Sequence, residues 1–98
     1  MRVLTVCGAG LGTGLLLKMY VQDVFDKLGL PVEIEATDVS SAKGIRADLI
    51  VTSVTLVSTL EEVETPIIAV QNVIDRDEIE QKLRSYFQSQ EADSGQNG

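Results

Sequence analysis

A single cysteine opens a glycine-rich stretch near the start of the chain. Cys7 follows the mainly apolar residues 1–6, and the stretch from Gly8 to Gly14 behind it holds four of the eight glycines. A loop that leaves a buried strand and enters a helix can point its amide groups inward, and such a loop is suited to hold an anion. The convergent amides and the helix dipole would stabilise a thiolate as well as a phosphate. The pattern therefore indicates phosphoryl chemistry at sulfur.

Length and composition favour one small globular domain. The chain has 98 residues, of which 44% are hydrophobic, so a modest core needs no disulfide or metal. One cysteine cannot form an internal disulfide. No apolar stretch reaches the roughly 18 residues of a membrane span, and the apolar start has no signal-peptide pattern. We expect a mature, soluble, cytoplasmic protein.

Charge and the lack of histidine exclude several classes of function. A formal net charge of -7 disfavours nucleic-acid binding, which depends on clustered lysine and arginine. The chain contains no histidine, so Ser-His-Asp and Cys-His catalysis within one chain are excluded and the commonest metal ligand is missing. The sequence implies no metal or cofactor, and any histidine in the mechanism must come from a partner.

Apolar periodicity in the first half predicts a strand, a helix and a second strand. Residues 2–6 form a short apolar run typical of a buried strand. Apolar residues recur at helical spacing over residues 13–28, and Gly29 is expected to end this helix. Residues 31–36 alternate apolar and acidic side chains, which predicts a half-exposed strand at a sheet edge.

The remaining elements are less regular. Residues 38–46 predict a loop or a short helix, and residues 47–52 a central strand covered on both faces. Residues 53–65 fit either a short helix or an irregular lid, because many of them are β-branched. Residues 66–70 predict a fourth strand.

A helix start is expected near residue 75. Asp75 is the predicted N-cap, with Glu78 three residues later as in a capping box. The domain is expected to span residues 1–90, and residues 91–98 lack an apolar anchor and are expected to be disordered.

Strands that alternate with helices or long loops predict a parallel sheet. The expected fold is α/β, a small doubly wound four-stranded sheet with helices on both faces. Ligands of such folds bind beyond the carboxyl ends of the strands. The glycine loop is therefore expected to lie near Thr52, Ser53 and Asn72, which complete the candidate site.

Nucleotide-binding versions of the glycine loop fit poorly. A dinucleotide fingerprint needs a third glycine where Thr13 or Leu15 stands. The nucleoside-triphosphate loop needs a lysine after its last glycine, and no glycine of this stretch is followed by one.

Two other functions of the thiol, phosphatase and redox chemistry, each need a residue that this chain lacks at the required place. A cysteine phosphatase needs an arginine after five residues to clamp the phosphate, and Thr13 occupies that place. Redox chemistry needs a resolving thiol, which this chain lacks. A small buried apolar cysteine remains as the structural alternative. Without the arginine, a phosphocysteine would be held and not hydrolysed, which suits a carrier.

The glycine loop and its flanks resemble the enzyme IIB components of the bacterial sugar phosphotransferase system (PTS), of the ascorbate and galactitol types. Most of the folded part shares the resemblance, which includes Lys18-Met19 on the first helix and Val70-Gln71-Asn72 before the last. Its most specific piece is Leu4-Thr5-Val6-Cys7-Gly8-Ala9-Gly10-Leu11-Gly12-Thr13.

The resemblance implies a Rossmann-like fold, similar to that of low-molecular-weight tyrosine phosphatases, and a phosphotransferase activity. It implies that Cys7 accepts phosphate from a phosphohistidine of the IIA component and passes it to sugar bound by the membrane-embedded IIC component. The protein would be cytoplasmic and associated with the membrane only through IIC. The phosphate would be held by Gly8, Ala9, Gly10, Leu11, Gly12 and Thr13.

Accessory roles and the sugar stay open. Gly14 stands where family members often carry a second hydroxyl, and Gln71 where the ascorbate group often has arginine. Lys18 lies about one helical turn beyond Thr13 and could lean toward the phosphate or be solvated. Thr52, Ser53 and Asn72 could contact phosphate or partner, or only shape strand ends and turns.

Two alternatives to a transport role remain at this point. A regulatory or sensor domain would bind partners according to the phosphorylation state of Cys7. A cysteine phosphatase or arsenate-reductase-like enzyme would turn over a small substrate, which the missing arginine disfavours.

Overall fold

The computed structural model describes the backbone of residues 1–7 and 11–97, and the side chains of residues 1–7 and 14–89. Four strands form one parallel sheet in the order β2-β1-β3-β4. The elements follow each other as β1 (Arg2–Val6), α1 (Leu11–Leu28), β2 (Glu33–Thr37), α2 (Val39–Ala42), β3 (Leu49–Ser53), the 3-10 helix η1 (Val54–Leu60), β4 (Ile67–Val70) and α3 (Arg76–Asn97).

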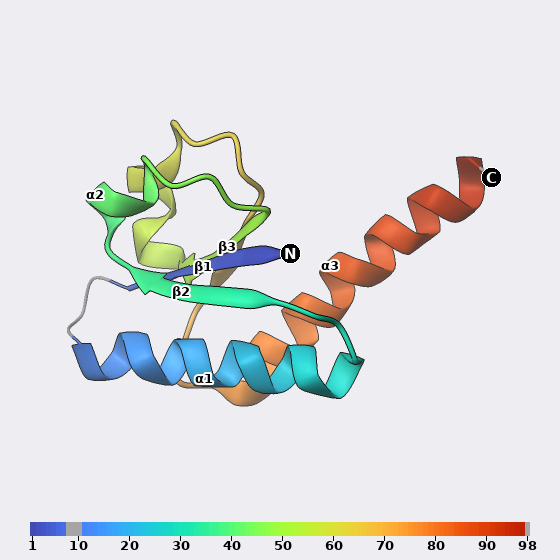
Figure 1. Cartoon of the computed structure of the whole chain (residues 1–98), viewed down its shortest axis with the longest axis horizontal. Coiled ribbons are helices and arrows are strands. Elements are labelled where there is room, and N and C mark those ends of the chain that lie inside the picture. Colours follow the sequence, from blue (N-terminus) through green and yellow to red (C-terminus); the bar gives the residue numbers. More distant parts are fainter. Residues whose placement is uncertain (8–10, 98) are drawn as a thin grey trace.

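Helices cover both faces of the sheet, as Figure 1 shows: α1 and α3 lie on one face, α2 and η1 on the other. The predicted doubly wound α/β fold is confirmed, with β1 and β3 in the centre and β2 at an edge. None of the helices in the described residues has the length and apolar character to span a lipid bilayer.

Alternating side chains of β1 enter two separate cores. Val3 points toward α1 and α3, whereas Leu4 and Val6 point toward α2 and η1. The first core also holds Leu17, Val21, Val24, Phe25, Ile34, Leu49, Val51, Ile68, Val70, Ile79 and Leu83. The second also holds Ala42, Ile50 and Leu60. A strand buried on both faces explains why the adjacent residues Val3 and Leu4 are both apolar.

Gly29 ends α1, as expected. Its φ of 69° is the only positive φ in the described residues, and a glycine adopts this conformation without strain. The amide of Gly29 donates to the Asp26 carbonyl (3.2 Å) and that of Leu30 to the Phe25 carbonyl (3.1 Å). These two bonds form a Schellman motif, which binds carbonyls that the helix end leaves free.

The irregular segments resolve into short capped helices. Asp38 caps α2, because its Oδ1 accepts the Ser41 amide at 2.7 Å. The segment after β3 forms η1, whose N-cap is Ser53. Both segments thus become short helices, one of the two forms that the sequence left open for each.

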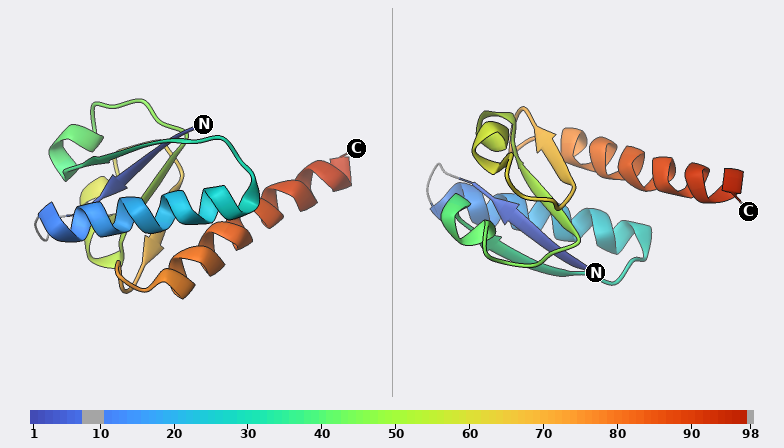
Figure 2. Two further views of the ribbon diagram at one scale, coloured as in Figure 1. Left: turned by 60° about the horizontal axis from the view of Figure 1, so that its bottom comes forward. Right: turned by 90° about the horizontal axis from the view of Figure 1, so that it is seen from above.

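The last helix differs from expectation at both ends. Asp75 accepts the Glu78 amide at 3.2 Å, but the reciprocal half of the capping box is missing, because the Asp75 amide donates to the Asn72 carbonyl. At the other end α3 continues to Asn97, through residues for which composition predicts disorder. Figure 2 shows this part of α3 extending away from the sheet. Phe87 packs edge-on against Phe25, with ring centroids 5.5 Å apart, and joins α3 to α1.

Candidate functional site

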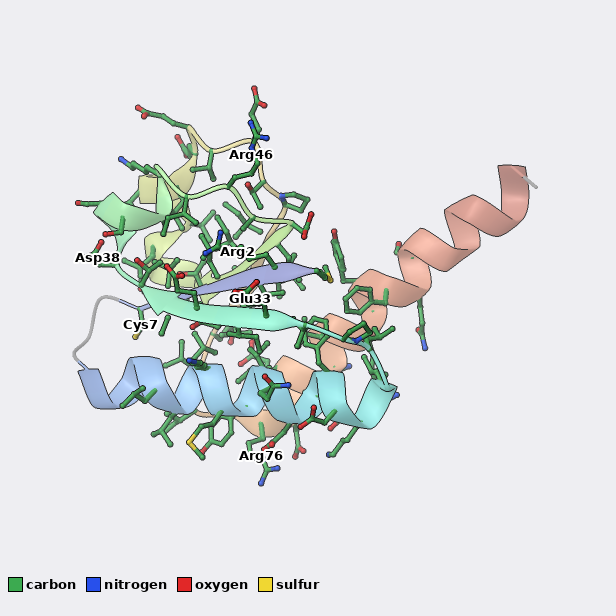
Figure 3. All side chains as sticks on the ribbon, in the orientation of Figure 1. Arg2, Cys7, Glu33, Asp38, Arg46 and Arg76 are labelled. Carbon is green, nitrogen blue, oxygen red and sulfur yellow. The ribbon has the colours of Figure 1, made fainter. Side chains whose placement is uncertain are left out.

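Cys7 lies directly after β1, at the carboxyl end of a central strand. β1 lies between β2 and β3 in the sheet. Its last residue, Val6, is paired with Thr37 of β2 and with Thr52 of β3. The thiol is free and half-buried. Figure 3 shows Cys7 at the end of the molecule where α1 begins. The parallel topology thus places the only cysteine where α/β folds bind their ligands.

The first turns of α1 approach the thiol. A Cβ placed on Gly14 would lie 4.0 Å from the Cβ of Cys7, which is ordinary van der Waals contact. The amino-terminal end of a helix carries a partial positive charge that favours an anion nearby. Of the expected phosphate-binding residues, Gly8, Ala9 and Gly10 lie outside the described residues, as do the side chains of Leu11 and Thr13.

A hollow of about 330 Å³ opens beside Cys7. Its walls come from three elements that are distant in sequence: the end of β1, the start of η1 and the loop after β4. Two of the predicted residues, Ser53 and Asn72, lie in this wall with Cys7. The remaining lining residues are Thr55, Leu56, Gln71 and Val73.

Thr52 and Ser53 have different partners although they are adjacent. Thr52 is fully buried, and its hydroxyl donates to the Val6 carbonyl at 2.8 Å. Because Val6 directly precedes Cys7, this hydrogen bond links the backbone next to the thiol to β3. The Ser53 hydroxyl instead accepts the Thr55 amide (3.2 Å) and shares a 2.9 Å hydrogen bond with the Thr55 hydroxyl. Ser53 therefore shapes the start of η1 at the rim of the hollow.

The loop between β4 and α3 is held by one carboxylate. The amides of Gln71 and Asn72 donate to Oε2 and Oε1 of Glu78, at 2.6 and 3.0 Å. The Gln71 hydrogen bond is the largest cause that holds the pKa of Glu78 below its ordinary value of 4.5, and burial opposes it. The Asn72 side chain accepts the Ile74 amide at 3.1 Å, so it forms the turn and does not point a free oxygen at the thiol.

Lys18 lies away from this hollow. It is exposed on α1 and lines a separate surface depression with Leu15 and Met19. In the part of the chain with described side chains, no group of three histidine, cysteine or acidic residues is arranged to hold a metal ion.

Sequence reasoning did not identify Glu78 and Lys82 as parts of the site. Lys82 pairs with Glu78 at 3.0 Å and donates to the Ala69 carbonyl at 2.6 Å. The capping-box pattern drew attention to Glu78, but it predicted a contact with Asp75 and not with the loop. Nothing in the local pattern marks Lys82, whose spacing to Glu78 fits an ordinary helical ion pair.

Chemically, the site offers one nucleophile beside a helix start. A thiol at the edge of an open hollow can be approached by a group on another molecule. No second thiol and no histidine exist in this chain to resolve or deprotonate it. The arrangement therefore suits acceptance and release of a group, with the partners supplying acid and base.

Comparison with known proteins agrees with this geometry. The model of the family described as "PTS system, Lactose/Cellobiose specific IIB subunit" matches residues 2–85. The "Ascorbate-specific PTS system EIIB component" of Mycoplasma pneumoniae is 33% identical over 86 residues, which are 85% of this chain and 90% of that protein.

A solved structure shares the fold. The lactose-specific IIB component domain from Streptococcus pneumoniae superimposes with a TM-score of 0.62 at 15% identity, over 90% of this chain and 95% of that one. The fold, the match to the family over most of the chain and the curated relative agree with one another. This chain therefore belongs to the family of IIB components of the sugar phosphotransferase system.

Proposed function

We propose that this IIB component carries a phosphoryl group on Cys7 between a IIA protein and sugar held by a IIC transporter. Membership of the family implies a phosphotransferase of sugar uptake. The observation that carries the finer proposal is the position of the only thiol, half-buried between a central strand end, the start of α1 and an open hollow.

In the first step the Cys7 thiolate attacks the phosphorus of a IIA phosphohistidine. The S–P bond forms as the P–N bond breaks, and the imidazole nitrogen keeps the electron pair. In the second step a sugar hydroxyl attacks the same phosphorus, its O–P bond forms, and the thiolate leaves. The hydroxyl proton passes to the transporter or to solvent. Amides of the loop from Gly8 to Thr13 and the positive end of α1 would stabilise the charge on phosphorus oxygens in both steps.

The proposed sugar class is ascorbate-like. It is supported by the name of the Mycoplasma pneumoniae relative, which covers most of this chain at 33% identity. The proposed location is the cytoplasm, with attachment to the membrane only through IIC.

The test is phosphate incorporation into wild type and Cys7→Ser from phosphorylated IIA protein. We expect label on the wild type and none on the variant, with the same circular dichroism spectrum for both. Dephosphorylated IIA protein serves as the blank. Labelling of Cys7→Ser at the wild-type level would contradict the assignment of Cys7.

A further inference from the structure

The loop between β4 and α3 forms one wall of the hollow beside Cys7. Gln71, Asn72 and Val73 line that wall. The loop leaves β4, an edge strand that pairs with β3 on one side only. In the described part of the chain no strand pairs with the outer side of β4, so the position of the peptides that follow Val70 depends on the groups that bind their amides.

Glu78 binds two consecutive amides of this wall. Oε2 accepts the Gln71 amide at 2.6 Å, and Oε1 accepts the Asn72 amide at 3.0 Å. Because each carboxylate oxygen takes one N–H, the contact fixes two successive peptide planes. Hydrogen bonds to an ionised acceptor are shorter and stronger than neutral ones. The Glu78 side chain is 18% exposed, whereas the two loop residues that it binds, Gln71 and Asn72, are exposed.

The carboxylate is itself held from the body of α3. Lys82 Nζ lies 3.0 Å from Oε2 of Glu78 and donates to the Ala69 carbonyl at 2.6 Å. Lys82 thus ties β4 to the same helix turn that binds the loop. The neighbouring helix residues Ile79 and Leu83 are fully buried. These contacts therefore fix the position of the wall relative to the packed core.

An ordinary role at the helix start does not account for Glu78. In a capping box its carboxylate would bind the amide of the N-cap residue. Here the Asp75 amide donates to the Asn72 carbonyl instead, and Glu78 reaches past it to Gln71 and Asn72. The carboxylate serves the wall of the hollow and not the end of the helix.

We propose that Glu78 is a positioning residue for phosphoryl passage through Cys7, acting by fixing the Gln71 and Asn72 peptides in the wall of the hollow. This inference rests on the proposed function. Glu78 itself is not among the residues that line the hollow beside Cys7. A displacement of about 1 Å in a group that orients the reactants can lower a rate by about 100-fold.

The test compares Glu78→Gln with Glu80→Gln. Both variants neutralise one glutamate on α3, but Glu80 binds Lys27 and Arg84 and makes no contact with the loop. Single-turnover phosphorylation of each protein by phosphorylated IIA protein is measured against donor concentration. For Glu78→Gln we expect the saturating rate to fall by about tenfold or more, with the half-saturating concentration within about twofold of wild type. For Glu80→Gln the saturating rate and the half-saturating concentration should both stay within about twofold of wild type.

Amide resonances give a second readout that does not depend on phosphate. In the Glu78→Gln spectrum at least one of the Gln71 and Asn72 amide protons should move upfield, because a neutral oxygen or an NH₂ group replaces a carboxylate oxygen. In Glu80→Gln both should stay in place. Unmoved amides in Glu78→Gln would overturn the inference whatever the rates are.

Each possible outcome of the rate measurements also supports or overturns the role of Glu78. A wild-type saturating rate in folded Glu78→Gln overturns the inference, as does an equal loss in Glu80→Gln. If Glu78→Gln does not fold, Glu78→Asp is measured in its place, because its shorter side chain withdraws the carboxylate from the Gln71 and Asn72 amides, and a wild-type saturating rate there overturns the inference. A wild-type protein that takes no phosphate contradicts the proposed function, and with it this inference. That failure is distinct, because it appears before any variant is compared.

Discussion

The chemistry proposed for this chain takes place at one sulfur atom, that of Cys7. Cys7 has no second thiol and no histidine in the chain to work with. Thr13 stands where a cysteine phosphatase carries the arginine that stabilises phosphate transfer to water. These residue types favour a carrier that holds a phosphoryl group until an acceptor arrives.

Thr52 supports the thiol from β3, and its loss should destabilise the fold measurably. In Thr52→Val the shape is kept but the hydrogen bond to the buried Val6 carbonyl is lost. Loss of one intramolecular hydrogen bond costs about 0.5–1.5 kcal/mol, so the free energy of unfolding in urea should fall by about that amount.

Thr59→Val is the matched control for this change. The Thr59 hydroxyl donates to the Leu56 carbonyl at 2.6 Å, but it does so at an exposed position where water replaces it. Its effect should stay within about 0.5 kcal/mol. Equal destabilisation by the two variants would show that the bond from Thr52 to Val6 has no special role.

At this scale the sequence indicates which residues matter but not their partners. Cys7, Ser53 and Asn72 can be placed at one edge because parallel strands end together. The bond from Thr52 to Val6 joins residues 46 apart and depends on the register of β1 with β3, which no local pattern encodes. Glu78 binds residues before its own helix, so helical spacing cannot reveal the contact.

At the scale of elements, short caps hold the connections around the sheet. Asp38 at the start of α2 is an example, because the Ser41 amide holds the pKa of its carboxyl below the ordinary value of 3.8. A carboxyl with a lower pKa in the folded state stabilises the fold when ionised. That stabilisation is complete above pH 3.8 and is lost as the pH falls through the folded-state pKa.

Asp38→Ala should therefore be less stable than wild type at neutral pH, and the difference should shrink as the pH falls below 3.8. Urea unfolding of both proteins between neutral and strongly acidic pH measures this. Glu62→Ala is the control, since Glu62 is exposed. A difference between wild type and Asp38→Ala that does not change with pH would contradict the role of the ionised cap.

Most helices and strands can be predicted from the pattern of apolar residues, but their boundaries cannot. The start of β2 moves from residue 31 to Glu33, because pairing begins where the Glu33 amide donates to the Met1 carbonyl. η1 could not be told from a lid, since β-branched residues weaken a helical pattern until Ser53 caps it. Gly29 was predictable because a helix that needs a left-handed end selects glycine.

At the scale of the whole molecule, the parallel sheet brings the site together. β1, η1 and the loop after β4 each contribute to the hollow, although the sequence separates Cys7 from Gln71 widely. Fold class was predictable because strands alternated with helical or long connections. The part of α3 beyond the core was not predictable. Composition shows that this segment lacks an apolar anchor, but it does not show whether the backbone stays helical.

Removal of residues 91–98 should leave the domain intact. The side chains that join α3 to the core lie earlier, at Ile79, Leu83, Tyr86 and Phe87. The free energy of unfolding should change by less than about 0.5 kcal/mol, and phosphate acceptance should not change.

A shorter chain that ends at Ser85 is the contrast. It lacks Tyr86 and Phe87 and the ring contact with Phe25, so it should lose about 3 kcal/mol or more, as core aromatic truncations do. Similar losses in both truncations would show that residues 91–98 belong to the folded unit.

The central claim is that Cys7 carries a phosphoryl group, and intact-protein mass spectrometry tests it most directly. After incubation with phosphorylated IIA protein, the wild type should gain the mass of one phosphoryl group, located on Cys7 with the acid and base stability of a thiophosphate. Addition of IIC with its sugar should remove that mass. No gain, or a gain that remains in Cys7→Ser, would contradict the account.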